Sequence, residues 1–218
     1  MRESKSNEEL WNDIKKDPWF IEKIENPDED MCIYCVENAW NTLKLIKEPS
    51  NNILKAALKA KGWAIQFIKN PSEELQLLAV ETNWDSIQYI KNPFESVKIK
   101  AIKINWKAIN YIDNTTIDME IAAVKQSAEA IMYISNITEE KKRLFIKENV
   151  NSIKYLNLED TDIIKEALKE KVSDANIDKQ YIFDFLKLKS LNINKTKLVY
   201  KFGSKKAKMY FVDFKLSV

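Results

Sequence analysis

Two cysteines three residues apart are the most reactive side chains in this sequence. Cys32 and Cys35 have the spacing of a redox pair or of half a zinc site. The chain has no second pair that could complete zinc coordination, because these are its only two cysteines. Cys35 also falls at a position that the repeat described below otherwise fills with alanine. We therefore predict no metal site here and interpret both residues as packed side chains on one helix.

The chain lacks most of the residue types and motifs that catalytic sites require. The chain has no histidine, which excludes Ser-His and Cys-His nucleophilic systems, His-ligated metals and imidazole acid–base chemistry. Its two glycines, Gly62 and Gly203, cannot form a glycine-rich phosphate loop. Paired carboxylates such as Glu73-Glu74 are explained by the preference for acids at helix N-termini. We expect no enzyme activity and no cofactor, although a hydrolase built from carboxylates stays open as a distant rival.

Lysines recur at two positions near the C-terminal ends of the predicted helices. The two rows are Lys59, Lys103, Lys125, Lys147 and Lys169, and Lys47, Lys69 and Lys91. The helix dipole favours lysine at such positions, so a solvated face is the simpler interpretation. Stacked rows could also follow a phosphate backbone or an acidic protein face. The net charge of +2 is far from the basic excess of a dedicated nucleic-acid binder.

These side chains are positioned by a 22-residue period that runs through most of the chain. The register is anchored at Asn26, Glu48, Asn70, Asn92, Asn114, Asn136 and Leu158. One aliphatic column consists of Ile21, Leu43, Ile65, Ile87, Ile109, Ile131 and Ile153. A second consists of Ile24, Ile46, Ile68, Ile90, Ile112, Ile134 and Leu156. A small-residue column holds Cys35, Ala57, Ala79, Ala101, Ala123 and Ala167, interrupted by Phe145, and is followed by Val36, Leu58, Val80, Ile102, Val124, Ile146 and Leu168.

Each repeat predicts a short helical hairpin. In Asn70-Pro71-Ser72-Glu73, asparagine is a favoured N-cap, proline suits the first helical position, and Glu73 is placed to close a capping box. A second helix is predicted from Trp84 to Lys91. Such short helices are marginal alone in water, so their stability must come from packing against neighbouring units.

The sequence therefore predicts a mainly α fold, an α-solenoid of seven HEAT-like helical hairpins. We expect a capping helix over residues 1–17, the solenoid over 18–172 and an appendage over 173–218. In the appendage, Tyr210, Val212, Phe214 and Leu216 alternate with Phe211, Asp213 and Lys215, as in a strand. Gly203-Ser204-Lys205-Lys206 separates this run from Leu198-Val199-Tyr200, which predicts a β-hairpin. We predict neither a signal peptide nor a membrane span, and the low cysteine count agrees with a cytoplasmic location.

We predict the partner surface on the second helix of each hairpin. A polar row that varies between units lies there, opposite the buried stripe: Lys44, Gln66, Gln88, Asn110, Met132 and Lys154. Beside it runs an aromatic column in which Tyr89, Tyr111 and Tyr133 could pack or could contact a partner. Trp40, Trp84 and Trp106, with Trp19 and Trp63 one place later, are interpreted as packing between layers. The alternative interpretation of the polar row, that it is a solvated surface with no binding role, stays open.

The segments from Trp63 to Val80 and from Trp84 to Ile102 repeat tryptophan, Ile-Lys-Asn-Pro, glutamate and a small-aliphatic pair in one register. This pattern resembles a family of short helical-hairpin repeat proteins common in bacteriophage and low-GC bacterial genomes, over about residues 18–168. The resemblance implies a phage or mobile-element origin, where small proteins often bind and block a host protein. It brings no functional residues with it.

We therefore expect a non-enzymatic protein-binding scaffold, a phage-encoded inhibitor of a host protein such as a defence-system component. The alternative is a nucleic-acid-binding solenoid that uses the lysine rows and the basic C-terminal hairpin, which carries seven lysines from Lys195 to Lys215 against Asp213. The expected partner is a host or phage protein, with no membrane and no small-molecule substrate.

Overall fold

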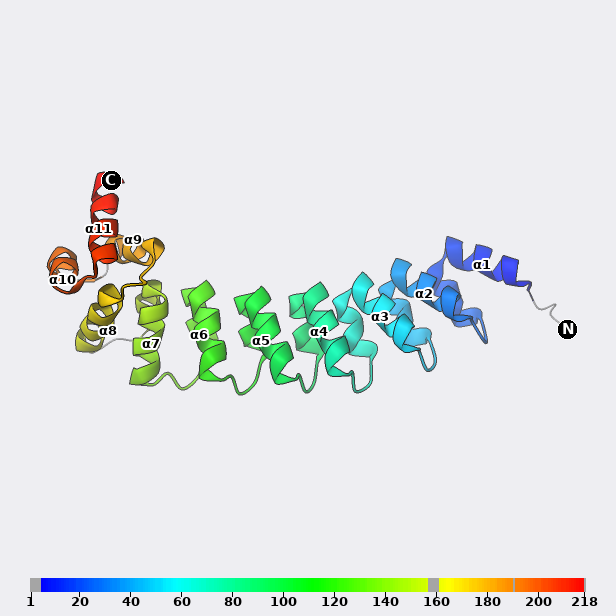
Figure 1. The fold of residues 1–218 in the computed structure, drawn as a ribbon. Helices are drawn as coiled ribbons and strands as arrows, with labels where there is room; N and C mark the ends of the chain where they lie inside the picture. The colour runs from blue at the N-terminus through cyan, green and yellow to red at the C-terminus, as the bar shows by residue number, and fades with distance from the viewer. Residues whose placement is uncertain (1–4, 157–160, 190, 218) are drawn as a thin grey trace. The chain divides into compact units, whose positions relative to one another are not determined.

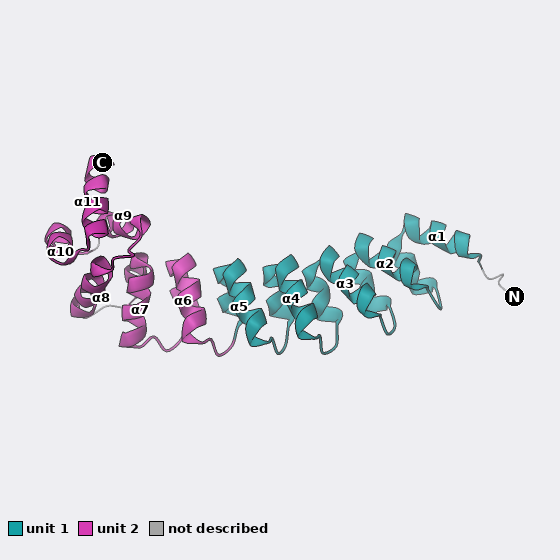
Figure 2. Cartoon of the chain, viewed as in Figure 1, with its two compact units in different colours: residues 1–112 teal, residues 113–218 magenta. Residues whose placement is uncertain are grey.

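The computed structural model describes residues 5–156, 161–189 and 191–217, and the statements below refer to these residues. The chain is mainly helical and divides into two compact units, residues 1–112 and residues 113–218 (Figure 2). Each unit is described by itself. Leu158, the last anchor of the repeat register, lies outside the described residues.

Unit 1 alternates α-helices with short 3-10 helices (Figure 1). Its α-helices are α1 (Asn7–Lys16), α2 (Glu29–Asn38), α3 (Asn51–Ala60), α4 (Glu73–Thr82) and α5 (Glu95–Ile104). Its 3-10 helices are η1 (Pro18–Lys23), η2 (Trp40–Leu45), η3 (Gly62–Phe67), η4 (Trp84–Tyr89) and η5 (Trp106–Tyr111). Consecutive α-helices from α2 to α5 pack on one another, and so do consecutive 3-10 helices from η1 to η5. The unit is thus a stack of α/3-10 pairs.

Unit 2 begins with two further pairs and ends in a helical cluster. The pairs are α6 (Ile117–Gln126) with η6 (Ala128–Tyr133), and α7 (Glu139–Glu148) with η7 (Val150–Lys154). The cluster consists of α8 (Thr161–Ser173), α9 (Lys179–Lys187), α10 (Lys195–Phe202) and α11 (Lys205–Ser217). The predicted repeating pairs of helical elements are therefore present in both units.

The second element of each pair is a 3-10 helix rather than the predicted α-helix. In place of a helix from Trp84 to Lys91, η4 ends at Tyr89, and the backbone at Ile90 is extended. The amide of Ile90 donates to the carbonyl of Ile87 at 3.1 Å. A three-residue turn brings Ile87, inside η4, and Ile90, its C-cap, to the same side, so both are buried although the helix has only six residues.

The turn before each α-helix also differs from the prediction. Asn70 is not the N-cap of α4: it adopts a left-handed backbone conformation with φ of 51°, and Ser72 is the N-cap. The Ser72 hydroxyl accepts from the Leu75 amide at 3.4 Å. Asparagine tolerates this left-handed region better than most residues, which explains its recurrence in the register. The prediction erred because Asn-Pro is both a capping signal and a turn signal.

Most members of the predicted core columns are buried; in the two aliphatic columns Ile24, Ile46, Ile68 and Ile153 remain partly exposed. Every member of the small-residue column and of the column after it has no exposed surface, from Cys35 and Val36 to Ala167 and Leu168. A further column of small side chains, missed in the sequence, lines the buried side of the 3-10 helices: Thr42, Ala64, Ser86, Ala108, Ala130 and Ser152. These small residues allow each 3-10 helix to lie close to its α-helix.

The predicted C-terminal β-hairpin is wrong: residues 195–202 and 205–217 are helical, and the described residues contain no strand. On α11 the inward side chains are Ala207, Tyr210, Phe211 and Phe214, which have the i, i+3, i+4, i+7 spacing of a helix. The residues from Tyr210 to Leu216 also alternate in the two-residue period of a strand, so the same residues fit both a helix and a strand. Ser204 caps α11 by accepting from the Ala207 amide at 3.2 Å, so the residues predicted as the hairpin turn instead begin a helix.

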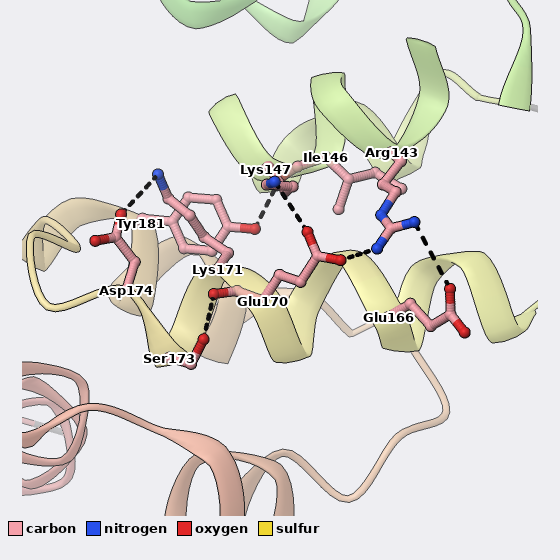
Figure 3. Close-up of polar contacts among 9 residues, drawn as sticks. All are labelled: Arg143, Ile146, Lys147, Glu166, Glu170, Lys171, Ser173, Asp174 and Tyr181. Carbon is pink, nitrogen blue, oxygen red and sulfur yellow. Dashed lines mark hydrogen bonds and ion pairs between the residues drawn. The ribbon is translucent and has the colours of Figure 1, made fainter. Parts of the chain in front are cut away.

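Polar contacts join the α-helices of unit 2 (Figure 3). The Tyr181 hydroxyl on α9 donates to the Ile146 carbonyl on α7 at 2.7 Å. Glu170 on α8 pairs with Arg143 and, at 2.9 Å, with Lys147, both on α7. Lys195 on α10 donates to the Leu186 and Leu188 carbonyls at the end of α9. Because Lys195 is partly buried there, its pKa is lowered.

Candidate functional site

Ring pairs connect successive 3-10 helices of unit 1. Trp40 stacks on Phe67 with ring centroids 5.9 Å apart. Trp63 meets Tyr89 edge-on at 6.1 Å, and Trp84 lies 6.4 Å from Tyr111. We call these six side chains the aromatic face. The predicted packing of tryptophans between layers is confirmed for these three rings.

The aromatic face remains partly open to solvent. Phe67, Tyr89 and Tyr111 are 36%, 38% and 42% exposed, and Trp40, Trp63 and Trp84 are half-buried. Each exposed ring ends its 3-10 helix, where it reaches the tryptophan of the preceding repeat. The rings are therefore held in place by the fold while one side of each still faces water.

The predicted polar row lies beside these rings, and in unit 1 all four of its members are exposed: Lys44, Gln66, Gln88 and Asn110. Gln66 donates its side-chain amide to the Trp63 carbonyl at 2.9 Å, and Gln88 does the same to Asp85 at 2.8 Å. These two amides are thereby fixed in orientation, with their oxygen atoms left as acceptors.

The face carries little net charge. In the described part of unit 1, the 3-10 helices contain two acids, Glu22 and Asp85, and three lysines, Lys23, Lys44 and Lys107. All three ammonium groups lie over aromatic rings: Lys44 is 4.8 Å from the Trp19 ring, and the other two are 5.1 Å and 5.8 Å from Phe20 and Trp106. Lys61, which directly precedes η3, adds a fourth ammonium 4.4 Å from the Trp63 ring, so the surface is aromatic with a small excess of positive charge.

In unit 2 the remaining predicted site residues are also exposed. Met132 is 61% exposed and Tyr133 is 47% exposed, both on η6. Lys154 on η7 lines a polar cleft of about 520 Å³ that η6, η7 and α9 enclose. Of the nine predicted site residues, Lys154 alone lines this cleft, and the others lie on the open faces of their units.

No pattern in the sequence predicts this cleft. Its walls carry the acids Glu129, Glu148, Asp178 and Asp184 and the bases Lys125 and Lys154. Asp184 accepts from Gln180 at 2.8 Å and from Asn151 at 3.4 Å, and burial raises the pKa of Tyr181 at the wall. Because α9 lies outside the repeat, no register could have placed its side chains against η7.

Only some members of the two lysine rows are exposed and without a contact to an acid or a ring among the described residues. In unit 1, Lys47, Lys59, Lys69, Lys91 and Lys103 are exposed. In unit 2, Lys147 pairs with Glu170, and the Lys169 ammonium lies 5.4 Å from the Phe202 ring. In unit 2 Lys125 is exposed and lines the polar cleft, so the rows contribute to packing only at Lys147 and Lys169 and remain solvated elsewhere.

Both cysteines are buried on α2, as predicted for Cys35. Burial raises the pKa of Cys32 to about 11 and that of Cys35 to about 12, which keeps both thiols protonated at neutral pH. No cluster of three or more His, Cys, Asp or Glu that could hold a metal ion occurs among the described residues.

No helix in the described part of the chain combines the length and the apolar character needed to cross a bilayer. Comparisons with protein-family models, with curated proteins and with solved structures found no match to this chain.

Proposed function

We propose that this chain is a non-enzymatic binding module that holds a protein partner on the aromatic face of unit 1. The observation that carries the proposal is the series of partly exposed ring pairs joining η2 to η5. Aromatic side chains are enriched where proteins bind proteins, because they bury a large area while losing few rotatable bonds. Here the rings are already fixed by their tryptophan neighbours, which lowers the entropic cost of binding.

The charge of the face favours protein over nucleic acid. A phosphate backbone is bound by several free lysine or arginine side chains. The lysines on the 3-10 helices of unit 1 lie over rings instead, and Glu22 and Asp85 share the same elements. The competing candidate is a nucleic-acid binder that uses the exposed rows containing Lys47 and Lys59.

The resemblance to phage and low-GC bacterial repeat proteins supports a more specific role for the proposed binding module. We propose that the protein acts in the cytoplasm, where it blocks a host protein such as a defence-system component. We also propose that the repeats form one continuous solenoid of seven hairpins. Small-angle scattering tests the second point: a profile of an elongated particle is expected, and that of a compact sphere would contradict it.

A matched pair of variants tests the binding face. The first is Gln66→Glu/Gln88→Glu/Asn110→Asp, which adds three charges beside the rings on exposed side chains. The control is Asn51→Asp/Lys59→Gln/Lys103→Gln, which changes the net charge equally on the exposed side of the α-helices. Both variants should keep the helical circular dichroism of the natural protein.

Capture from a lysate of the cells in which the protein is naturally made, quantified by mass spectrometry, gives the readout. We expect one protein to be enriched by the natural chain and by the control, and to be lost with the first variant. Equal enrichment by both variants would refute the aromatic face as the contact surface. Binding of a random oligonucleotide at low salt, lost as the salt concentration rises, would favour the nucleic-acid alternative.

A further inference from the structure

Helix α11 in unit 2 has two apolar faces, of which the fold uses only one. Its inner face buries Ala207 and Phe211, and Phe214 packs edge-on against Phe183 of α9 at 5.2 Å. Asp213 also pairs with Lys179 of α9 at 2.8 Å. These contacts fix the rotation of the helix, so its opposite face is directed away from α9.

The opposite face carries three large apolar side chains that are exposed to solvent. Met209, Val212 and Leu216 are 51%, 45% and 83% exposed. Their i, i+3, i+7 spacing places them within about 60° of one another on a helix of 100° per residue. We call these three residues the outer stripe. An apolar stripe continuous along an exposed helix is uncommon on a soluble surface and indicates a contact with something apolar.

Lysines surround the outer stripe. Lys205 lies at its N-terminal end, Lys208 and Lys215 lie along one border, and Lys206 lies towards the other. Within the described residues, none of these four forms an ion pair, although the Lys215 ammonium also lies 5.8 Å from the ring of Phe211 on the inner face. The only acid on α11, Asp213, is neutralised by Lys179. The helix therefore presents apolar side chains framed by unneutralised positive charge.

We propose that α11 binds an anionic lipid surface, with the outer stripe entering the headgroup region and the lysines contacting acidic headgroups. Long lysine stems can lie along the apolar side chains while their ammonium groups reach the phosphate level. Lysines at the end and on both sides of the stripe suit a surface that is negative in every direction. This contact is peripheral and requires no membrane-spanning helix.

Other occupants fit this face less well. A second copy of α11 would bring the same lysines together around the shared stripe, and like charges repel. A nucleic acid would satisfy the lysines but would leave Met209 and Leu216 against phosphates. An acidic protein helix would place its carboxylates along a line, whereas these lysines lie on more than one side of the stripe.

Vesicle sedimentation with the full chain tests the proposal. The probes are phosphatidylcholine vesicles containing about one third phosphatidylserine, and vesicles of phosphatidylcholine alone. The protein should sediment with the anionic vesicles, remain in solution with the neutral ones, and dissociate as salt screens the lysines. No sedimentation with anionic vesicles at low salt would overturn the proposal, and so would equal binding to both compositions.

Variants locate the contact on α11. Lys208→Glu/Lys215→Glu should reduce binding to anionic vesicles by more than about twentyfold, since each surface lysine contributes about fivefold. Leu216→Ser should weaken binding through the apolar contact without changing charge. The control, Lys59→Glu/Lys103→Glu in unit 1, makes the same charge change and should bind within about threefold of the natural protein. Equal loss in the control would show that net charge, not α11, causes the binding.

The changed side chains on α11 and in the control are exposed or border solvent, so the variants should unfold at the same temperature as the natural chain. The result is also independent of the proposed protein-binding face, because the three α11 positions lie outside unit 1. If Lys208→Glu/Lys215→Glu captures the protein partner normally, a loss of vesicle binding in this variant can be assigned to α11 and not to the aromatic face.

Discussion

The indole nitrogen of Trp63 donates a 2.9 Å hydrogen bond to the carboxylate of Asp85, which lies one repeat later in the chain. The bond joins η3 to η4 on the same surface where the Trp63 ring meets Tyr89. It thus fixes the orientation of the tryptophan that supports one of the exposed rings. This contact connects the stability of the stack with the shape of the proposed binding surface.

Replacing Asp85 by alanine should destabilise unit 1 by about 1–2 kcal/mol, because a charge-assisted hydrogen bond to a half-buried indole is lost. Urea unfolding followed by tryptophan fluorescence measures the change. Asp85→Asn keeps an acceptor oxygen and should lose less than half as much. Equal losses in the two variants would mean that the Trp63 bond contributes nothing and that only the charge of Asp85 matters.

Glycine at position 62 is required by close approach rather than by backbone conformation. A Cβ atom there would lie 2.2 Å from the Ala79 carbonyl oxygen and 2.5 Å from the Ser86 hydroxyl. Both neighbours belong to the next repeat, so Gly62→Ala should push η3 away from α4 and η4. We expect a loss of about 1–3 kcal/mol, as for an overpacked core.

Lys59→Ala, at an exposed position on the preceding helix, serves as the control for Gly62→Ala and should change the unfolding free energy by less than about 0.5 kcal/mol. A Gly62→Ala protein as stable as this control would show that the two repeats do not pack as closely as described.

The repeat and its core could be predicted because aliphatic residues recur at fixed positions, and burial does not depend on the exact type of helix. Ile65 and Ile87 are buried whether their element is α or 3-10. The 3-10 geometry could not be predicted, because Ile87 and Ile90 are three residues apart and that spacing fits both helix types. On α11, Tyr210 and Phe214 fit strand and helix periods alike, and only the packing against α9 decides between them.

An ion pair between a partly exposed lysine and a buried carboxylate replaces an apolar side chain in unit 2. The Lys141 ammonium lies 2.8 Å from both carboxylate oxygens of Glu120, and the Thr115 hydroxyl donates to one of them at 3.0 Å. Preceding repeats hold aliphatic residues at the register of Lys141, as at Ile53, Leu75 and Val97. Lys141 thus occupies a position that these repeats fill with hydrocarbon, whereas the register of Glu120 is also polar at Gln76 and Lys98.

Lys141→Ala should cost about 3–5 kcal/mol, because it leaves the carboxylate of Glu120 buried without its cation. The double variant Glu120→Leu/Lys141→Leu should recover most of that loss, since it removes the unpaired buried charge and places an aliphatic side chain at the register of Lys141. Chemical denaturation of the three proteins provides the comparison. A double variant less stable than Lys141→Ala would show that the pair stabilises unit 2 beyond its packing.

The thiols predict a dependence of stability on alkaline pH. The pKa of Cys35 rises from an ordinary value of 9.0 to about 12 in the folded chain, so above pH 9 the unfolded state releases this proton first. The contribution of the protonated thiol is present in full below pH 9 and is lost as the pH rises towards 12. The slope should not exceed about 1.4 kcal/mol per pH unit for one group.

Cys35→Ala removes this titration and should therefore flatten the decline in stability above pH 9. At neutral pH it should cost little, since alanine occupies the same register at Ala57 and Ala79. Thermal unfolding across pH 7 to 11 tests both points. Identical alkaline profiles for the two proteins would show that Cys35 is not protected by burial.

The candidate surface was only partly accessible to sequence reasoning. The variation of their row between units predicts Gln66 and Gln88 as surface residues, and the structure places them on the exposed side of η3 and η4. The pairing of Trp63 with Tyr89 was not predicted, because it depends on how far one repeat rotates against the next. The cleft beside α9 likewise depends on packing outside the repeat.

Hydrogen–deuterium exchange of the natural chain, alone and with the partner recovered by capture, tests the central claim most directly. We predict slower amide exchange in the complex for peptides covering η2 to η5. Peptides covering α3 to α5 should exchange at nearly the same rate with and without the partner. Protection confined to α3 to α5, or absent from unit 1 altogether, would contradict binding on the aromatic face.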